Sequence, residues 1–243
     1  MNAPGGERQL PLDLGHRAAL GREDFLVAPS NRNAVAWVDR WPDWPDRGLV
    51  IWGPPACGKS HLAEVWRGRS GAVRLGSRDL SVREPDVLLG EAIHACVEDA
   101  DDRGGALRLG TPDQGRSERA LFVLYNHVAE RGGHLLITAN TAAARWSVRL
   151  ADLRSRLNAL GSVWIERPDQ ELIAGVLVKQ LADRQLRVRP EVIRYLVDRM
   201  ERSFAAAHAV VEAVDRTALA GQRAVTVPLA RRVLAELMPA EES

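Results

Sequence analysis

The sequence predicts an α/β domain with a mostly parallel sheet, followed by a small all-helical domain. Three observations lead to this prediction. Up to residue 167, short apolar runs alternate with helical patterns, which is typical of βαβ units. From Asp169 to Met238 the pattern indicates four helices and no strand. A glycine-rich turn, GPPACGKS, connects the first apolar run directly to the helical pattern that follows it.

Five short apolar segments bounded by turn residues are the predicted strands. The clearest helices between them cover Ser117–Glu130 and about Val148–Asn158. The glycine-rich segment Asp102–Arg116 predicts a surface loop. The predicted strands are Gly48–Trp52, the segment GAVRL around Val73, His94–Glu98, His134–Ala139 and Ser162–Glu166.

Breaks in the pattern divide the chain into three parts. A boundary lies near Arg167-Pro168, where the strand-like runs end. Within the helical part, Arg189-Pro190, Ser203 and Thr226-Val227-Pro228 predict helix breaks or caps. We therefore expect a flexible tail at 1–18, an α/β domain at 19–167 and a helical domain at 168–243.

Composition and charge exclude several classes of function. With 243 residues, 46% of them hydrophobic, the chain can bury a sizeable core. A formal net charge of +1 gives no overall field for gripping nucleic acid or an anionic membrane. The two cysteines, Cys57 and Cys96, form neither a metal-binding spacing nor a disulfide framework. The sequence shows no secretory signal and no apolar run of membrane-spanning length, so we expect a soluble cytoplasmic protein.

The turn GPPACGKS matches the pattern G-x-x-x-x-G-K-[ST] of a phosphate-binding loop in full. Gly53 and Gly58 allow a tight backbone whose N–H groups point at phosphate oxygens, and the following helix adds the partial positive charge of its N-terminus. Lys59 is expected to reach the β- and γ-phosphates, and the Ser60 hydroxyl can bind Mg²⁺. We therefore predict a nucleotide site formed by Gly53, Pro54, Pro55, Ala56, Cys57, Gly58, Lys59, Ser60 and His61.

Glu98 and Asp99 follow the third predicted strand, where a phosphate-binding loop needs an acidic partner for its metal. We expect Glu98 to associate with the metal, together with Ser60, and Asp99 to orient a water molecule. The usual order is aspartate first, so the reversed order shifts both carboxylates by about a bond length, which can cost on the order of 10²-fold in rate. The alternative, that these two residues simply begin an acidic loop, stays open.

Several segments resemble the AAA+ domain of the bacterial replication initiator DnaA, and they occur in the order of that family. The resemblance covers most of the chain from about Phe25. It implies an AAA+ P-loop NTPase core, with a parallel sheet sandwiched by helices, followed by a helical lid. The segments are FLVAPSNRNAVAWVDRWP, GKSHLA, ALFVLYNHVAERGGHLLITAN and LADLRSRLNALGSVWIERPDQE.

The same resemblance implies roles for residues outside the loop. Asn140 would be the sensor 1 residue beside the γ-phosphate, and Arg202 would be sensor 2 in the lid. Arg156 would be the arginine finger, which in this family points into the nucleotide site of a neighbouring subunit. From the residues alone, Asn140 could equally cap a loop, and both arginines could be ordinary solvated side chains. The adenine pocket would contain Phe25, Leu26, Val27 and Asn31.

A full initiator continues beyond its lid into a helix-turn-helix domain, whereas this chain stops at Ser243. We therefore expect no direct sequence-specific DNA binding, and the sequence resembles the Hda family of DnaA-related regulators. That resemblance implies bound ADP or ATP with Mg²⁺, weak or no intrinsic ATPase activity, and an arginine finger supplied in trans. The implied function is to stimulate ATP hydrolysis by DnaA and thereby inactivate it. The implied partners are DnaA and the β sliding clamp of DNA polymerase III, with no membrane, and a homodimer is an open possibility.

The tail contains RQLPLDL, Arg8–Leu14, which alone could be an edge strand or a latch onto its own domain. In an Hda-like chain it fits the Q-L-x-L-x-L form of clamp-binding peptides. Gln9 would hydrogen-bond at the rim of the clamp pocket, and Leu12 and Leu14 would enter its apolar groove. The predicted clamp-binding residues are Gln9, Leu10, Leu12 and Leu14, and the clamp would place the protein at the replisome.

Two other functions fit the same motifs. AAA+ helicase loaders and single-stranded-DNA-binding remodelling ATPases share this core, and salt-dependent binding to single-stranded DNA would favour them. A P-loop phosphotransferase would turn over nucleotide alone, faster with a metabolite, but the sequence shows no obvious acceptor pocket.

Overall fold

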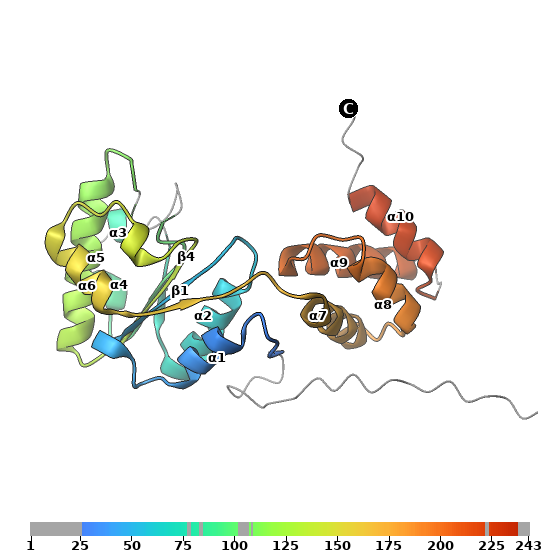
Figure 1. Cartoon of the computed structure of the whole chain (residues 1–243), viewed down its shortest axis with the longest axis horizontal. Helices are drawn as coiled ribbons and strands as arrows, with labels where there is room; N and C mark the ends of the chain where they lie inside the picture. Colours follow the sequence, from blue (N-terminus) through green and yellow to red (C-terminus); the bar gives the residue numbers. More distant parts are fainter. Residues whose placement is uncertain are drawn as a thin grey trace, which may run out of the picture.

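The computed structural model describes residues 26–76, 79–82, 85–101, 107, 109–221 and 224–237. Two adjoining bodies are visible in Figure 1: a sheet covered by helices, and a smaller helical body joined to it after β5. This is the predicted fold class, an α/β core followed by an all-helical lid. The tail and Phe25 lie outside the described residues.

In the part of the chain that the structure describes, the sheet has five strands in the order β2-β3-β4-β1-β5, and all neighbouring pairs are parallel. All five predicted strands are present. The last is displaced slightly from its predicted bounds, because its residues pair with β1 only as far as Trp52, where β1 ends. The strands are β1 Gly48–Trp52, β2 Val73–Leu75, β3 Ala95–Val97, β4 Leu135–Ala139 and β5 Gly161–Trp164.

Successive strand residues point to opposite faces of the sheet, and this alternation builds two separate cores. Ile51 and Leu136 belong to the core beneath α1 and α2, whereas Val50 and Ile137 belong to the core that includes α3 to α6. The sheet is therefore the middle of three layers. The helices are α1 Arg32–Asp39 and α2 Lys59–Ser70 on one face, and α3 Asp79–Val82, α4 Pro85–Leu89, α5 Gln114–Glu130 and α6 Ala151–Ala159 on the other.

Helix α5 begins earlier than the sequence predicts, inside the segment predicted to be a surface loop. The Nε2 atom of Gln114 donates to Glu118 and to the carbonyl oxygen of Ser147, both at 2.7 Å, so this polar side chain is buried within the fold. Leu107 is also fully buried. The described part of the segment is thus partly core, because buried polar and apolar side chains anchor it.

Among its described residues the lid has four helices, as predicted, around its own apolar core. Asp169 caps the first of them by accepting a hydrogen bond from the backbone N–H of Leu172 at 2.8 Å. Ser203 accepts one from Ala206 N at 3.1 Å, so the predicted cap at this serine is confirmed. The helices are α7 Gln170–Asp183, α8 Pro190–Val197, α9 Phe204–Gly221 and α10 Val227–Leu237.

Candidate functional site

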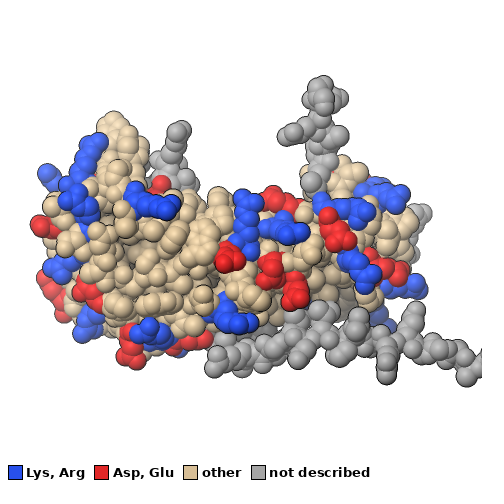
Figure 2. Space-filling view, in the orientation of Figure 1, with Lys and Arg blue, Asp and Glu red and all other residues tan. Residues whose placement is uncertain are grey.

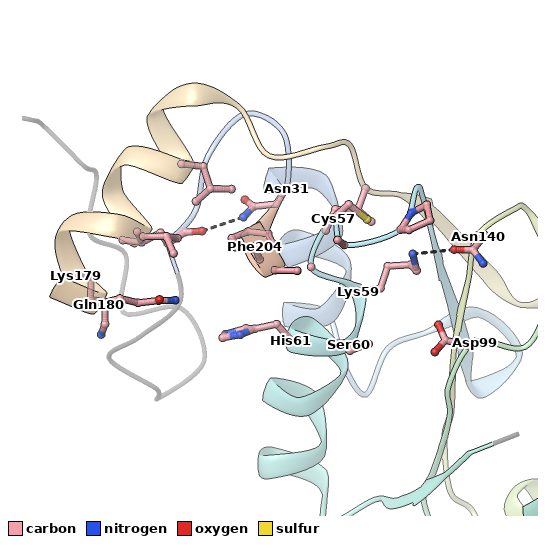
Figure 3. A pocket seen from close by; sticks show the side chains of 18 of the residues that line it. Asn31, Cys57, Lys59, Ser60, His61, Asp99, Asn140, Lys179, Gln180 and Phe204 are labelled. Atoms are coloured by element: carbon pink, nitrogen blue, oxygen red, sulfur yellow. Dashed lines mark hydrogen bonds between the residues drawn. The ribbon is translucent and has the colours of Figure 1, made fainter. Parts of the chain in front are cut away.

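A cavity of about 610 Å³ lies between the loop after β1 and the lid. Figure 3 shows Lys59, Asp99 and Asn140 at one end of it and Lys179 at the other, with Phe204 between them. Leu172 and Val176 of α7 also line the cavity. One end is therefore charged and polar, and the other is formed partly by apolar lid residues, as a nucleotide's phosphates and base require.

The loop after β1 has the backbone of a phosphate-binding turn. Ala56 and Gly58 have positive φ angles of 57° and 104°, and α2 begins at the next residue, Lys59. A side chain at Gly58 would come within 2.9 Å of the Phe204 ring, and one at Gly53 within 2.2 Å of the Ile165 carbonyl oxygen. Close approach therefore favours glycine at both positions, and at Gly58 the positive φ angle favours it as well.

Lys59 lies at the centre of the polar end and is only 6% exposed. Its Nζ atom donates to the carbonyl oxygens of Gly53 and Pro54 at 2.8 Å each, and to Oδ1 of Asn140 at 3.3 Å. Asn140 follows β4, so the predicted loop lysine and the predicted sensor 1 residue lie together. Burial raises the pKa of the neighbouring Cys57 thiol, although Lys59 opposes this shift, so Cys57 stays a neutral packing group.

The two acidic residues after β3 have different surroundings. Asp99 lines the cavity, and its backbone N–H donates to Oγ1 of Thr138 at 3.0 Å. Glu98 has a side chain 8% exposed, and its Oε2 atom accepts a hydrogen bond from Nη2 of Arg74 at 2.7 Å. Arg74 lies on the neighbouring strand β2. Asp99 is thus the carboxylate that faces the cavity, while Glu98 is engaged in an ion pair.

Mg²⁺ is the metal that the resemblance implies for this site. Ser60 and Asp99 line the cavity, and their side chains offer the oxygen atoms that Mg²⁺ prefers. In the part of the chain that the structure describes, no group of three or more His, Cys, Asp or Glu side chains could hold a metal alone. This donor set fits a Mg²⁺ ion that is held jointly by nucleotide phosphates and one or two side chains.

The predicted adenine segment is only partly at the cavity. Leu26 and Asn31 line it, whereas Val27 packs against the apolar core beneath α1 and α2. Asn31 fixes the turn, because its Oδ1 atom accepts from Ala28 N at 2.8 Å and its Nδ2 atom donates to Leu26 O at 2.9 Å. The segment therefore brings one apolar and one polar side chain to the cavity.

The lid reaches the cavity through the start of α9. Phe204 packs against Gly58, and its backbone N–H donates to the carbonyl oxygen of Ala56 at 3.4 Å. Phe204 and Ala205 line the cavity, whereas the predicted sensor 2 residue, Arg202, is exposed and does not line it. Sequence reasoning missed Phe204, because a helix-start phenylalanine gives no signal of a docking role.

Arg156 lies apart from this cavity, in the last turn of α6, where it is exposed. Its guanidinium carbon lies 5.3 Å from the ring centre of Tyr125, a cation–π contact. Burial and a hydrogen bond from the Tyr125 hydroxyl to Asp46 raise the pKa of that tyrosine to about 12. The ring is thus a neutral platform that holds the arginine at the surface of the α/β core.

Buried polar side chains of α5 hold the start of the helix that carries Arg156. Glu118 is 1% exposed, and its two carboxylate oxygens accept from the backbone N–H groups of Arg149 and Leu150 at 2.9 Å each. A negative charge at the N-terminus of a helix stabilises it. The signal that could have found Glu118 is the position of this charged residue in the buried, mostly apolar stripe of α5.

The predicted clamp-binding residues, Gln9 to Leu14, lie outside the described residues. Among the residues that the structure covers, no helix is long and apolar enough to cross a membrane.

Comparisons with known proteins agree with this architecture. The family model described as "Hda, lid domain" matches residues 169–234. Domain III of the replication initiation protein DnaA from Thermotoga maritima aligns with a TM-score of 0.74 and 15% identity, covering 89% of this chain and 96% of that one. AMPPCP-bound DnaA from Aquifex aeolicus aligns with a TM-score of 0.65 and 16% identity over 81% of this chain and 65% of that one.

A more distant neighbour has the same core. The FIGL-1 AAA domain in complex with ADP aligns with a TM-score of 0.57 and 13% identity, covering 82% of this chain and 74% of that chain. At these identities the structural likeness shows a shared AAA+ fold. The family model adds that residues 169–234 are similar to the lid domain of Hda. The described chain therefore has the AAA+ fold of the DnaA domain, with a parallel five-stranded core, and residues 169–234 match the Hda lid.

Proposed function

We propose that this protein binds an adenine nucleotide, is tethered to the β sliding clamp by its N-terminal tail, and stimulates ATP hydrolysis by DnaA, which inactivates the initiator. The observation that carries the proposal is the position of Arg156. This arginine is exposed on α6, outside the cavity of its own chain, and Tyr125 supports it from below. A cation so placed can act on a neighbouring molecule's nucleotide.

The protein's own site supports nucleotide binding. The N-terminus of α2 and the ammonium group of Lys59 present positive charge to phosphates, and the apolar lid residues Leu172 and Val176 suit a base. Ser60 and Asp99 would hold Mg²⁺, which neutralises phosphate charge when it is bound. Two of the similar DnaA structures contain AMPPCP, and the FIGL-1 structure contains ADP, so the fold accommodates both kinds of nucleotide in those proteins.

In the proposed complex, Arg156 contacts the phosphates in the DnaA site as the terminal phosphoryl group leaves. Its guanidinium group neutralises the developing charge, and Tyr125 and Glu118 keep its helix in place. The tail would add affinity by capture of an extended peptide, with Leu12 and Leu14 in an apolar groove of the clamp. Tethering raises the effective concentration of the protein near DnaA at the replisome.

The test is the rate of ATP hydrolysis by DnaA in the presence of clamp loaded on DNA. Arg156→Ala should lower the stimulation by about 10³-fold, because arginine fingers contribute factors of this size. Arg154→Ala is the matched control, since Arg154 is exposed on the same helix and should retain most of the stimulation. Full stimulation by the Arg156 variant would disprove the trans role.

The tether is tested separately by clamp binding. Removal of residues 1–14, or Leu12→Ala with Leu14→Ala, should abolish binding to the isolated clamp while leaving nucleotide binding intact. Salt-dependent binding to single-stranded DNA without clamp or DnaA would instead support a helicase-loader function. The face in Figure 2 shows positive and negative side chains interspersed, and this pattern favours protein partners over a nucleic-acid backbone.

A further inference from the structure

Asp101, two residues beyond Asp99, is bonded to the segment that follows β4. Its Oδ1 atom accepts a hydrogen bond from the backbone N–H of Asn140 at 2.7 Å. Its Oδ2 atom accepts from the backbone N–H of Thr141 at 2.7 Å and from the Thr141 hydroxyl at 2.6 Å. One carboxylate therefore accepts three short hydrogen bonds from two consecutive residues. Such charge-assisted hydrogen bonds are about twice as strong as neutral ones.

Further hydrogen bonds fix the two residues before Asp101 against β4. Thr138, within β4, accepts from Asp99 N at 3.0 Å through its hydroxyl and from Ala100 N at 2.9 Å through its carbonyl oxygen. The segments that follow β3 and β4 are thus joined at several successive points. The position of Asp101 relative to Asn140 is consequently set by the sheet.

Asn140 is the residue through which this connection reaches the cavity. Its backbone is held by Asp101, and its side-chain oxygen lies 3.3 Å from Nζ of Lys59. The lysine of a P-loop reaches the β- and γ-phosphates, so a side chain in contact with it lies within reach of the terminal phosphate. A diphosphate lacks that phosphate, so a contact with Asn140 favours the triphosphate, and it contributes most when the position of Asn140 is fixed before binding.

We propose that Asp101 is a positioning residue that fixes Asn140 for recognition of the terminal phosphate of a nucleoside triphosphate. The inference deepens the proposed function and rests on its nucleotide-binding step. Without the carboxylate, the Asn140 and Thr141 N–H groups lose their acceptor. The segment that contains Asn140 and Thr141 then becomes ordered only when the nucleotide binds, and this ordering lowers the affinity. Affinity for the triphosphate then falls, while affinity for the diphosphate, which does not use Asn140, changes little.

The experiment measures dissociation constants for ADP and for the non-hydrolysable triphosphate AMPPCP on the full chain by titration calorimetry. Asp101→Ala should weaken AMPPCP binding by about tenfold, in line with the loss of a charge-assisted contact, and should leave ADP binding within about twofold. Asp101→Asn keeps one acceptor oxygen and should fall between the wild type and Asp101→Ala. A merely structural role would change the dissociation constants for AMPPCP and ADP by the same factor, so their ratio tests the positioning role.

Asp79→Ala is the matched control. Asp79 also accepts a backbone hydrogen bond, from Gly76 N at 2.7 Å, but it touches neither Asn140 nor Thr141. Its removal should leave the ratio unchanged. An Asp101→Ala protein with the wild-type ratio, or with equal losses for both nucleotides, would overturn the inference. Failure of the wild-type protein to bind either nucleotide would instead overturn the proposed function.

Discussion

The Nζ atom of Lys59 lies 3.3 Å from Oδ1 of Asn140, and this contact joins the start of α2 to the end of β4. The same ammonium group is held over its own loop by the carbonyl oxygens of Gly53 and Pro54. Phosphate oxygens entering the loop compete for the same ammonium group. Nucleotide binding and the surroundings of Asn140 are therefore coupled through one lysine.

Lys59→Ala is expected to remove most of the stabilisation that ADP gives to the protein. A ligand at 100 times its dissociation constant stabilises the folded state by about 2.7 kcal/mol, so saturating ADP should raise the thermal unfolding midpoint of the wild type. The variant lacks the ammonium group that faces the phosphates, and its midpoint should hardly move. Thermal unfolding with and without ADP measures this difference.

Arg202→Ala is the control for that measurement, because Arg202 is exposed and does not line the cavity. This variant should keep the wild-type shift. A loss as large as that of Lys59→Ala would mean that the lid brings Arg202 to the nucleotide on binding, as the DnaA-like pattern of the sequence predicts.

The P-loop and the strands could be predicted because their signals are local. Gly48 to Ser70 form one continuous strand–loop–helix unit, and every requirement of that unit is met by neighbours in sequence. The ion pair of Glu98 could not be predicted, since its partner Arg74 comes from another strand and the pairing depends on sheet order.

The contacts between the lid and the P-loop could not be predicted from the sequence for a similar reason. Whether Arg202 or Phe204 meets the P-loop depends on how α9 docks, which is a tertiary property. In the sequence, Asp101 is one of several acidic residues after β3. Its partners Asn140 and Thr141 lie about forty positions away, and no pattern in the sequence connects them.

Arg74→Gln should increase the dependence of nucleotide affinity on Mg²⁺. Arg74 now neutralises Glu98, so this carboxylate is less able to attract a metal or its water ligands. Without the guanidinium group, Glu98 becomes available beside Asp99, and the ratio of ADP affinities in Mg²⁺ and in EDTA should rise by several-fold. Fluorescence titration with a labelled ADP measures the ratio.

Two further variants test whether the change in that ratio comes from Glu98. Arg69→Gln removes an arginine that pairs with Asp39 at 3.4 Å on the same side of the sheet, and it should not change the ratio. Adding Glu98→Gln to the Arg74 variant should return the ratio to the wild-type value. If Arg74→Gln alone has no effect, Glu98 takes no part in metal binding.

Glu118→Ala should destabilise the α/β core by about 3 kcal/mol, because it leaves buried donors without an acceptor. The donors are the Arg149 and Leu150 N–H groups and the side-chain amide of Gln114. Glu118→Gln keeps one oxygen acceptor and should cost less. Urea unfolding measures both, and Glu130→Ala at the exposed end of α5 should stay within about 0.5 kcal/mol of the wild type. A Glu118→Ala protein as stable as this control would show that these hydrogen bonds contribute little.

The free energy of unfolding should fall as the pH falls below about 6.5, because His94 and His134 are held neutral in the fold. Their rings lie 5.4 Å apart, and the backbone N–H of His134 donates to Nδ1 of His94 at 2.9 Å. Burial lowers the pKa of both side chains, and His134 lowers the pKa of His94 further. The unfolded chain therefore binds more protons than the folded chain in this pH range. Each histidine contributes at most about 1.4 kcal/mol per pH unit, and solvent access lowers this value.

Urea unfolding between pH 5 and pH 8 measures the dependence, and His94→Gln should make it shallower by up to one proton. His208→Gln is the matched control, because His208 is exposed on α9 beside Glu212 at 3.2 Å and lies outside the histidine pair. An unaltered slope in the His94 variant would assign the acid sensitivity to other groups. A stability that stays constant from pH 8 to pH 5 would mean that the folded and unfolded chains bind the same number of protons throughout this range, and it would contradict the prediction.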